Sequence, residues 1–196
     1  MNNQRTSDHP VDSNFIERWS PRAFAATSMP RADLLTILEA ARWAPSSYNI
    51  QPWRFLYSER QDANWPRYLD VLLPFNLQWA QHASALVVVL SDTVMPGDAE
   101  QGQKLSRTHS FDAGAAWAQL ALQATSLGYH AHAMAGIDIE KTRESLQVPD
   151  HFQVEIAIAV GVRAEPSALP EVLREREYPS DRLPLDEIAF AGLFPQ

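Results

Sequence analysis

The stretch DAGAAWAQLALQATSL, residues 112–127, predicts a long helix at the centre of the fold. Small side chains lie all round this helix: Ala113, Gly114, Ala115, Ala116, Ala118, Ala121 and Ala124. Small side chains let a neighbouring helix approach closely. We therefore expect this helix to pack either against another helix within the domain or at a subunit interface.

Two continuous apolar runs on either side of this helix predict strands that are buried on both faces, over residues 85–90 and 154–162. Further strands are expected at 53–57 and 129–135. Apolar spacing and proline positions predict helices at 12–19, 30–43, 76–83, 140–147 and 185–190. A further helical stretch is expected after the strand at 53–57, ending at residue 72. This mixed order of helices and strands indicates an α/β domain of three layers.

Composition and length narrow the class of protein. The chain has 196 residues, of which 45% are hydrophobic, so we expect one domain over residues 12–196 after a flexible N-terminus, 1–11. A net charge of −8 argues against binding to nucleic acid or to anionic membranes. The sequence has no cysteine, no signal-peptide pattern and no apolar run long enough to span a membrane, so a cytoplasmic protein is the simplest expectation.

The segment from Ala44 to Trp53 is rich in polar side chains and lies between two prolines, directly after a predicted helix. Pro45 and Pro52 restrict the backbone, while hydroxyl and carboxamide groups between them can donate and accept hydrogen bonds. One interpretation is a rigid rim for a flat polar ligand. The alternative is an ordinary loop from helix to strand.

A second candidate is the segment Arg18-Trp19-Ser20-Pro21-Arg22, where a helix gives way to extended chain. Its two guanidinium groups and one hydroxyl could bind a phosphate. Alone, the same pattern also fits a helix C-terminus whose arginines interact with the last carbonyl groups.

Several other patterns in the sequence have ordinary structural explanations. The sequence contains no G-x-G-x-x-G, Walker A, G-x-S-x-G or H-E-x-x-H motif. His130 and His132 share one face of a predicted strand, but a third ligand at a suitable spacing is missing, so no metal site is expected. The alternating charges of Glu171, Glu175 and Glu177 with Arg174 and Arg176 predict a solvated face of a helix or a loop.

Taken in order, the motifs resemble those of the FMN-dependent nitroreductase family, from about residue 14 to residue 190. The resemblance is carried by Arg18-x-Ser20-x-Arg22-x-Phe24, the 44–53 segment, Phe75-Asn76 before the strand at 85–90, Asp112-x-Gly114, Leu127-Gly128-Tyr129, Ala135-Gly136-Ile137-Asp138, Ala159-Val160-Gly161 and Arg182-x-Pro184-Leu185-x-Glu187. It implies an α+β fold of three layers with a central mixed, mainly antiparallel sheet flanked by helices. It also implies a homodimer, with the long helix at the interface and FMN in a cleft between the subunits.

The resemblance assigns a role to each site residue. Arg18, Ser20 and Arg182 would hold the phosphate and the ribityl chain, and Trp19 belongs to the same cofactor-binding segment. Arg22 would stabilise the anionic reduced flavin beside N1 and the C2 carbonyl. Further cofactor contacts would come from Asn76 at the pyrimidine edge, from Ala133, Met134, Ala135 and Gly136 along the ring near N5, and from Pro45, Ser46, Ser47, Asn49 and Gln51 of the partner subunit.

The function implied by the resemblance is hydride transfer from NAD(P)H, through flavin N5, to an electron-poor small molecule such as a nitroaromatic, quinone or enone, by a ping-pong mechanism. Phe75 and Trp79 would line the acceptor pocket. No catalytic acid or base and no metal is expected, since the flavin supplies the chemistry.

This chain departs from the family pattern at Trp79 and Ser180, where basic residues are common, and at Ala135, where some members have an acidic residue. The affinity for FMN and the flavin potential depend on these positions. Two alternatives therefore stay open. One is an FMN enzyme with a different reaction, of the dehalogenase, flavin-fragmenting or dehydrogenase type, and the other is a non-catalytic flavin-binding or interaction protein.

Overall fold

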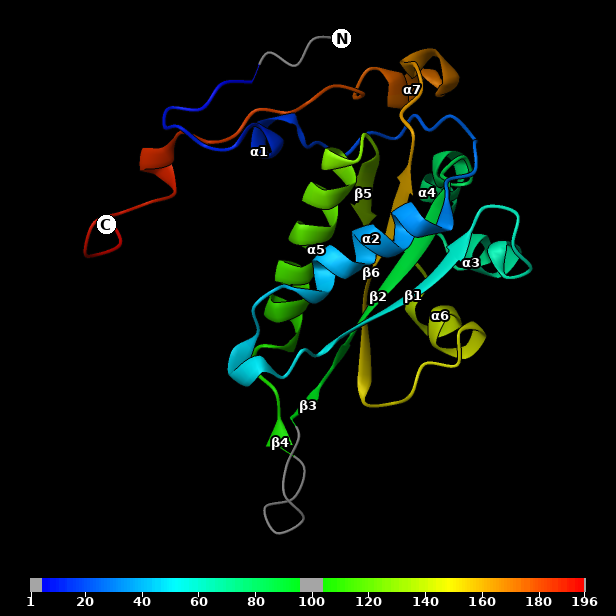
Figure 1. The fold of residues 1–196 in the computed structure, drawn as a ribbon, viewed down its shortest axis with the longest axis horizontal. Helices are drawn as coiled ribbons and strands as arrows, with labels where there is room; N and C mark the ends of the chain where they lie inside the picture. Colours follow the sequence, from blue (N-terminus) through cyan, green and yellow to red (C-terminus); the bar gives the residue numbers. More distant parts are fainter. Residues whose placement is uncertain (1–4, 96–103, 196) are drawn as a thin grey trace.

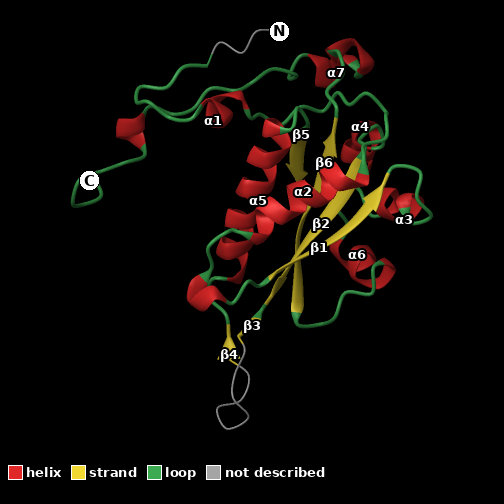
Figure 2. Ribbon diagram, viewed as in Figure 1, coloured by secondary structure: helices red, strands yellow, loops and turns green. Residues whose placement is uncertain are grey.

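The computed structural model describes residues 5–95 and 104–195, and its centre is an antiparallel sheet of four strands (Figures 1 and 2). The strands run in the order β1-β2-β6-β5, and every neighbouring pair in this sheet is antiparallel. Their bounds are β1 Trp53–Glu59, β2 Ala85–Asp92, β5 His130–Met134 and β6 Phe152–Gly161. A separate two-stranded ribbon pairs β3, Val94–Met95, with β4, Lys104–Leu105.

The central strand β2 shows how the sequence separates two hydrophobic cores. Successive side chains of a strand point to opposite faces of the sheet. Leu86, Val88 and Leu90 join one core, whereas Ala85, Val87 and Val89 join the other. Because both faces are covered, the strand consists almost entirely of apolar residues.

Helices α2, Arg31–Arg42, and α5, His109–Ser126, pack on one face of the sheet (Figure 1). In α2 the buried residues Leu34, Ile37 and Ala41 recur at helical spacing. The buried stripe of α5 consists largely of alanine, which lets this long helix lie close to the sheet and to α2. The opposite side of α5, which includes Gly114 and Ala118, is exposed.

The other face of the sheet is covered by α3, Trp65–Asp70, α4, Pro74–Ala80, and α6, Ile139–Ser145 (Figures 1 and 2). Proline stands in the first turn of both α3 and α4, where its missing N–H costs no helical hydrogen bond. Asp138 caps α6 by accepting a hydrogen bond from the Lys141 amide (3.0 Å). Large side chains such as Trp65, Tyr68 and Trp79 fill this second core.

The N-terminal segment from residue 5 and the C-terminal segment around residues 176–189 lie outside these layers and run beside each other near one end of α5 (Figure 1). The N-terminal part contains the short helix α1, Ser13–Glu17, and the C-terminal part contains η2, Pro166–Ala168, α7, Glu171–Arg174, and η3, Leu185–Glu187. A last short helix, η1, Ser47–Asn49, precedes β1. From residue 181 to residue 195 every residue is exposed, including six large apolar side chains: Leu183, Leu185, Ile188, Phe190, Leu193 and Phe194.

The structure confirms the α+β fold with helices on both sides of the sheet, and corrects several details. The described sheet is wholly antiparallel rather than mixed. Helix α5 begins at His109, three residues earlier than predicted, and α7 occupies part of the charged stretch for which the sequence left a helix or a loop open. Most of the polar stretch 98–107 lies outside the described residues, apart from its end at β4. No helix in the described ranges has both the length and the apolar character needed to cross a membrane.

Candidate functional site

Arginine side chains gather around a pocket of about 370 Å³ between the N-terminal and C-terminal segments. Five of its lining residues are arginines: Arg5, Arg18, Arg22, Arg176 and Arg182. The remaining lining residues are Trp19, Ser20, His132, Tyr178 and Ser180, so none of the described residues that line the pocket carries a carboxylate. Guanidinium and hydroxyl groups together form the donor set that binds a phosphate. We call this cavity and its lining residues the arginine pocket.

The end of α1 positions the first group of pocket residues. The Asp12 side chain caps the helix by accepting a hydrogen bond from the Asn14 amide (2.9 Å), and the Arg18 amide closes the helix on the Asn14 carbonyl oxygen (2.9 Å). The chain then leaves the helix in an extended conformation at Arg18, before Pro21. Arg18 Nη1 lies within hydrogen-bond distance of Ser20 Oγ (3.4 Å), so two of the predicted phosphate ligands are adjacent.

The C-terminal segment contributes every second residue from Arg176 to Arg182 to the pocket. This spacing of two is that of an extended chain with one side facing the pocket. Arg182 Nη1 donates to the carbonyl oxygens of Ser180 (3.2 Å) and Asp181 (3.0 Å). The sequence alone missed Arg176 and Tyr178, although this period-two pattern was a signal for them.

Arg5 also lines the pocket, although it belongs to the segment expected to be flexible. Its guanidinium donates to the carbonyl oxygens of Ile16 and of Arg18 (3.1 Å). Together with Arg176 it supplies pocket cations that the sequence did not assign.

The positive charges in the pocket disfavour one another. Burial and the neighbouring Arg182 lower the pKa of Arg18, and burial, Arg182 and Arg18 lower the pKa of Arg5. For Arg22, burial lowers the pKa, the Glu177 carboxylate raises it and Arg176 lowers it. An anion in the pocket would relieve this repulsion, since an opposite charge favours the charged form of each guanidinium.

His132, a residue of strand β5, lines the arginine pocket where the pocket meets the sheet. Its Nδ1 donates to the Pro21 carbonyl oxygen (2.9 Å), and burial lowers its pKa to about 4 despite this hydrogen bond. His130, two residues earlier on β5, has a pKa lowered to about 4 by burial and by Arg163. Both imidazoles are therefore neutral at pH 7.

Asn76 and Gly136, which the family resemblance places beside the flavin ring, are in direct contact. Asn76 Nδ2 donates to the Gly136 carbonyl oxygen (3.0 Å), and the Leu73 amide donates to the same oxygen (3.1 Å). A Cβ atom at Gly136 would lie only 2.4 Å from Asn76 Nδ2. This close approach explains why glycine stands there.

The remaining residues predicted beside the ring differ in exposure. Ala135 is exposed and Ala133 is partly exposed, whereas the Met134 side chain is buried in the core, so only the Met134 backbone could face a ligand. Phe75 is 50% exposed at the surface of α4 and stays a candidate for contact with an acceptor.

The structure overturns the prediction that Trp79 lines a substrate pocket. Trp79 is completely buried, stacked on Phe24 with ring centroids 6.2 Å apart and tilted against His132 at 4.7 Å. It faces inward because the side of α4 that carries Trp79 and Ala80 packs on the second core. Trp79 therefore supports His132 from behind instead of facing the solvent.

The prediction that Glu177 is solvated is also wrong, since Glu177 is only 2% exposed. Its Oε1 accepts hydrogen bonds from the amides of Arg22 (2.8 Å) and Ala23 (2.9 Å). Glu171 and Glu175 are exposed, as expected.

The segment from Ala44 to Trp53 forms a constrained loop. Tyr48, Asn49 and Gln51 have φ angles of 51°, 54° and 53°, a left-handed conformation that is unfavourable for residues other than glycine. Ser46 Oγ accepts a hydrogen bond from the Gln51 amide (2.9 Å), and the Asp112 carboxylate accepts one from the Ser47 amide (3.2 Å). The loop is thus held against the first turn of α5.

The loop and α1, which leads into the Arg18–Arg22 segment, lie near opposite ends of α5 (Figure 1). The loop contacts Asp112 near the beginning of the helix, while Trp19 of the pocket packs against His130, just after its end (ring centroids 6.2 Å apart). At 1.5 Å per residue an 18-residue helix is roughly 27 Å long. One chain therefore does not bring these two predicted halves of the site together.

Comparisons with known proteins agree with this fold and with the motif order. The family model described as "Nitroreductase family" matches residues 16–78 and 56–162. A crystal structure of an FMN-containing oxidoreductase is 49% identical, with a TM-score of 0.95 over 100% of this chain and 98% of that chain. An FMN-dependent nitroreductase from Clostridium difficile R20291 is 25% identical, with a TM-score of 0.59 over 76% of this chain and 85% of its own. Among curated proteins, an NADH dehydrogenase of Thermus thermophilus is 28% identical over 88% of this chain and 91% of its own length. The family match spans most of the sequence, and the chain belongs to the nitroreductase family.

Proposed function

We propose that this chain is an FMN-dependent oxidoreductase that takes electrons from NADH or NADPH and delivers them to an electron-poor small molecule, such as a nitroaromatic, a quinone or an enone. The observation that carries this proposal is the arginine pocket, whose five arginines and three hydroxyl-bearing side chains form a donor set that suits a phosphate group. The similar oxidoreductase that contains FMN and the similar NADH dehydrogenase support the choice of cofactor and of electron donor.

In this proposal each part of the site has a separate task. Arg18, Ser20 and Arg182, joined by Arg5 and Arg176, hold the phosphate. Arg22 places a positive charge beside the pyrimidine part of the ring, and the packed pair of Asn76 and Gly136 recognises its edge. FMN, when bound, supplies hydride transfer at N5, so the protein needs no acid or base of its own.

We further propose that a second copy of the chain completes the site. The loop at residues 45–51 is too far from the arginine pocket of its own chain, so the loop of the partner would cover the flavin. Two exposed surfaces support association: the α5 side with Phe111, Gly114 and Ala118, and the apolar C-terminal arm from Leu183 to Phe194. Exposed apolar surface of this extent is typical of a protein interface.

Titration of the purified apoprotein with FMN, followed by flavin fluorescence, tests the cofactor. Saturable binding with one FMN per chain is expected, and a chain that takes up no FMN would rule out every flavin enzyme reading. Under anaerobic conditions, NADH or NADPH should then bleach the yellow protein. A flavoprotein that neither nucleotide reduces would instead be a flavin-binding protein of another kind.

Each open reaction then has its own readout. Reoxidation of the bleached protein by nitroaromatics, quinones or enones is expected, with the acceptor reduced. Release of halide, loss of the flavin itself, or reduction of the oxidised flavin by a substrate in the absence of nicotinamide would point to the dehalogenase, flavin-fragmenting and dehydrogenase alternatives respectively.

A further inference from the structure

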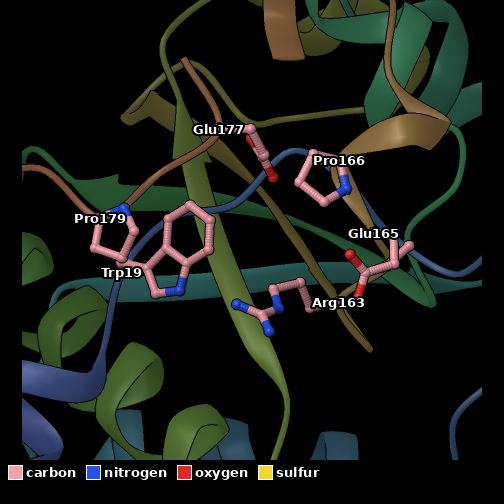
Figure 3. A pocket seen from close by; sticks show the side chains of 7 residues that line it. Trp19, Arg163, Glu165, Pro166, Glu177 and Pro179 are labelled. Atoms are coloured by element: carbon pink, nitrogen blue, oxygen red, sulfur yellow. The ribbon is translucent and has the colours of Figure 1, made fainter. Parts of the chain in front are cut away.

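Glu177 is a buried carboxylate beside the arginine pocket, and hydride transfer through FMN does not require a carboxylate there. It follows α7 and points inward between two exposed neighbours, Arg176 and Tyr178, that line the pocket. Figure 3 shows its carboxylate directed into a small space bordered by Trp19 and Pro166. That space has a volume of about 10 Å³, roughly one water-sized sphere, so it is a gap in the packing and not a ligand site.

The two oxygen atoms of this carboxylate have different surroundings. Oε1 accepts hydrogen bonds from the backbone amides of Arg22 and Ala23. These bonds hold the backbone at residues 22–23, directly after the pocket residues Arg18, Trp19 and Ser20. Oε2 has no hydrogen-bond partner among the described residues, and Arg22 Nη1 lies 4.0 Å from it. A buried carboxylate with one unbonded oxygen is unfavourable unless a nearby positive charge compensates for it.

The contact with Arg22 is largely shielded from water, since the two side chains are only 17% and 1% exposed. Electrostatic interactions between such groups are weakly screened. Arg22 thus has the Glu177 carboxylate near its Nη1 atom and also lines the arginine pocket, where a bound ligand would lie.

We propose that Glu177 is a positioning residue for Arg22 that also moderates its charge, and thereby sets the flavin potential below the value that an unpaired arginine would give. This inference rests on the proposed function, because it requires FMN in the arginine pocket with its ring beside Arg22. A positive charge near N1 stabilises the anionic reduced flavin, and a carboxylate behind that charge weakens the effect. Removing the carboxylate charge while keeping its shape should therefore raise the potential.

Glu177→Gln is the decisive variant, because its amide oxygen can still accept from the Arg22 and Ala23 amides. We expect the ratio of reduced to oxidised FMN affinity to rise about tenfold, which for a two-electron couple corresponds to about 30 mV. The potential is measured by anaerobic titration against a reference dye. Glu165→Gln is the matched control, since Glu165 borders the same small space but is exposed, and its potential should stay at the wild-type value.

Other outcomes separate this inference from the proposed function. A wild-type protein that binds no FMN would refute the proposed function itself. A wild-type protein that binds FMN, together with a Glu177→Gln variant at the wild-type potential, would refute only the role of Glu177. An equal rise in Glu165→Gln would do the same, because it would reflect net charge alone.

Hydrogen exchange of the wild-type apoprotein gives a second test that does not depend on how a variant folds. The amides of Arg22 and Ala23 should exchange slowly, because they donate to a buried carboxylate. Exchange at the rate of an exposed loop would show that Glu177 does not hold this backbone, and would overturn its positioning role.

Discussion

Gly136 shows how a single missing side chain shapes the candidate flavin site. In Gly136→Ala the new methyl group would meet Asn76 Nδ2 at 2.4 Å, so Asn76 must move and its hydrogen bond to the residue 136 carbonyl must break. We expect unfolding by urea to show a loss of about 1–3 kcal/mol, and FMN binding to weaken. Gly114→Ala is the control for the unfolding measurement alone, because a Cβ atom there meets nothing within 4 Å of its own chain, whereas Gly114 lies on the proposed subunit interface. Equal affinity in wild type and Gly136→Ala would contradict the role of Asn76.

The two arginines that the sequence did not assign should matter as much as the predicted ones. In Arg5→Ala and Arg176→Ala the phosphate would lose a charge-assisted hydrogen bond, so the FMN dissociation constant should rise roughly 10- to 100-fold, as in Arg18→Ala. Isothermal titration measures the change. Riboflavin, which lacks the phosphate, should bind all of these proteins alike, and Arg174→Ala should leave FMN binding intact because Arg174 does not line the pocket. If the arginine variants lost as much affinity for riboflavin as for FMN, these arginines would not act on the phosphate.

The two histidines of β5 predict how stability depends on pH. Their pKa values in the folded protein are lowered from 6.5 to about 4, so below pH 6.5 the unfolded chain binds protons that the folded chain does not. The stability of the apoprotein should therefore be full above pH 6.5 and fall as the pH drops toward 4. Urea unfolding at several pH values measures this slope. Replacing both histidines with glutamine should flatten it, whereas His151→Gln, at an exposed position, should not.

At the scale of elements, Asp112 joins the first turn of α5 to the strained loop that follows α2. Its carboxylate accepts from the Ser47 amide and from Thr108 Oγ1 (3.1 Å), and its negative charge suits a helix N-terminus. In Asp112→Ala we expect about 1–3 kcal/mol of lost stability and faster hydrogen exchange at the Ser47 amide. Asp33→Ala, which removes a carboxylate from the first turn of α2 instead, is the control and should leave the exchange rate of the Ser47 amide unchanged. If the Ser47 amide exchanged equally fast in wild type and Asp112→Ala, the loop would be held by its own backbone alone.

Elements were predictable from the sequence where one local pattern decides them. The apolar runs of β2 and β6 and the spacing of Leu34, Ile37 and Ala41 in α2 depend only on nearby residues. Trp79 was misplaced because helical position does not say which face of α4 packs on Phe24, a residue distant in sequence. Likewise, α7 is a single turn that follows a proline, too short for an apolar period to reveal.

The candidate site was predictable only in part, for a similar reason. Arg18, Ser20, Arg22 and Arg182 follow from motif order, and the structure places them around one pocket. Arg5 and Arg176 belong to no motif, and they reach the pocket only because the two ends of the chain lie beside each other. The burial of Glu177 depends on the same long-range contact, whereas alternating charges in sequence ordinarily indicate solvent.

At the scale of the whole molecule, the exposed C-terminal arm predicts association. Six large apolar side chains from Leu183 to Phe194 are at least 40% exposed in a single chain, so a chain that ends at residue 182 should lose this candidate surface for a second copy. We expect the full chain to be a dimer by light scattering and the shortened chain to be a monomer that binds FMN weakly. Circular dichroism controls for the fold. A shortened chain that remains a dimer would show that α5 and the loop suffice for association.

The separation of the loop from the arginine pocket makes a sharper prediction for mixed dimers. Arg18→Ala damages the phosphate half of the site, and Asn49→Ala with Gln51→Ala damages the loop half. If the halves come from different subunits, a mixed dimer contains one site with both defects and one site with none. Subunit exchange between the two variants should therefore restore tight FMN binding at one site per mixed dimer, whereas each variant alone stays weak. If light scattering and mass spectrometry confirm mixed dimers but binding does not recover, each chain must build its site from its own residues, and the loop would need to move the length of α5 to reach the flavin.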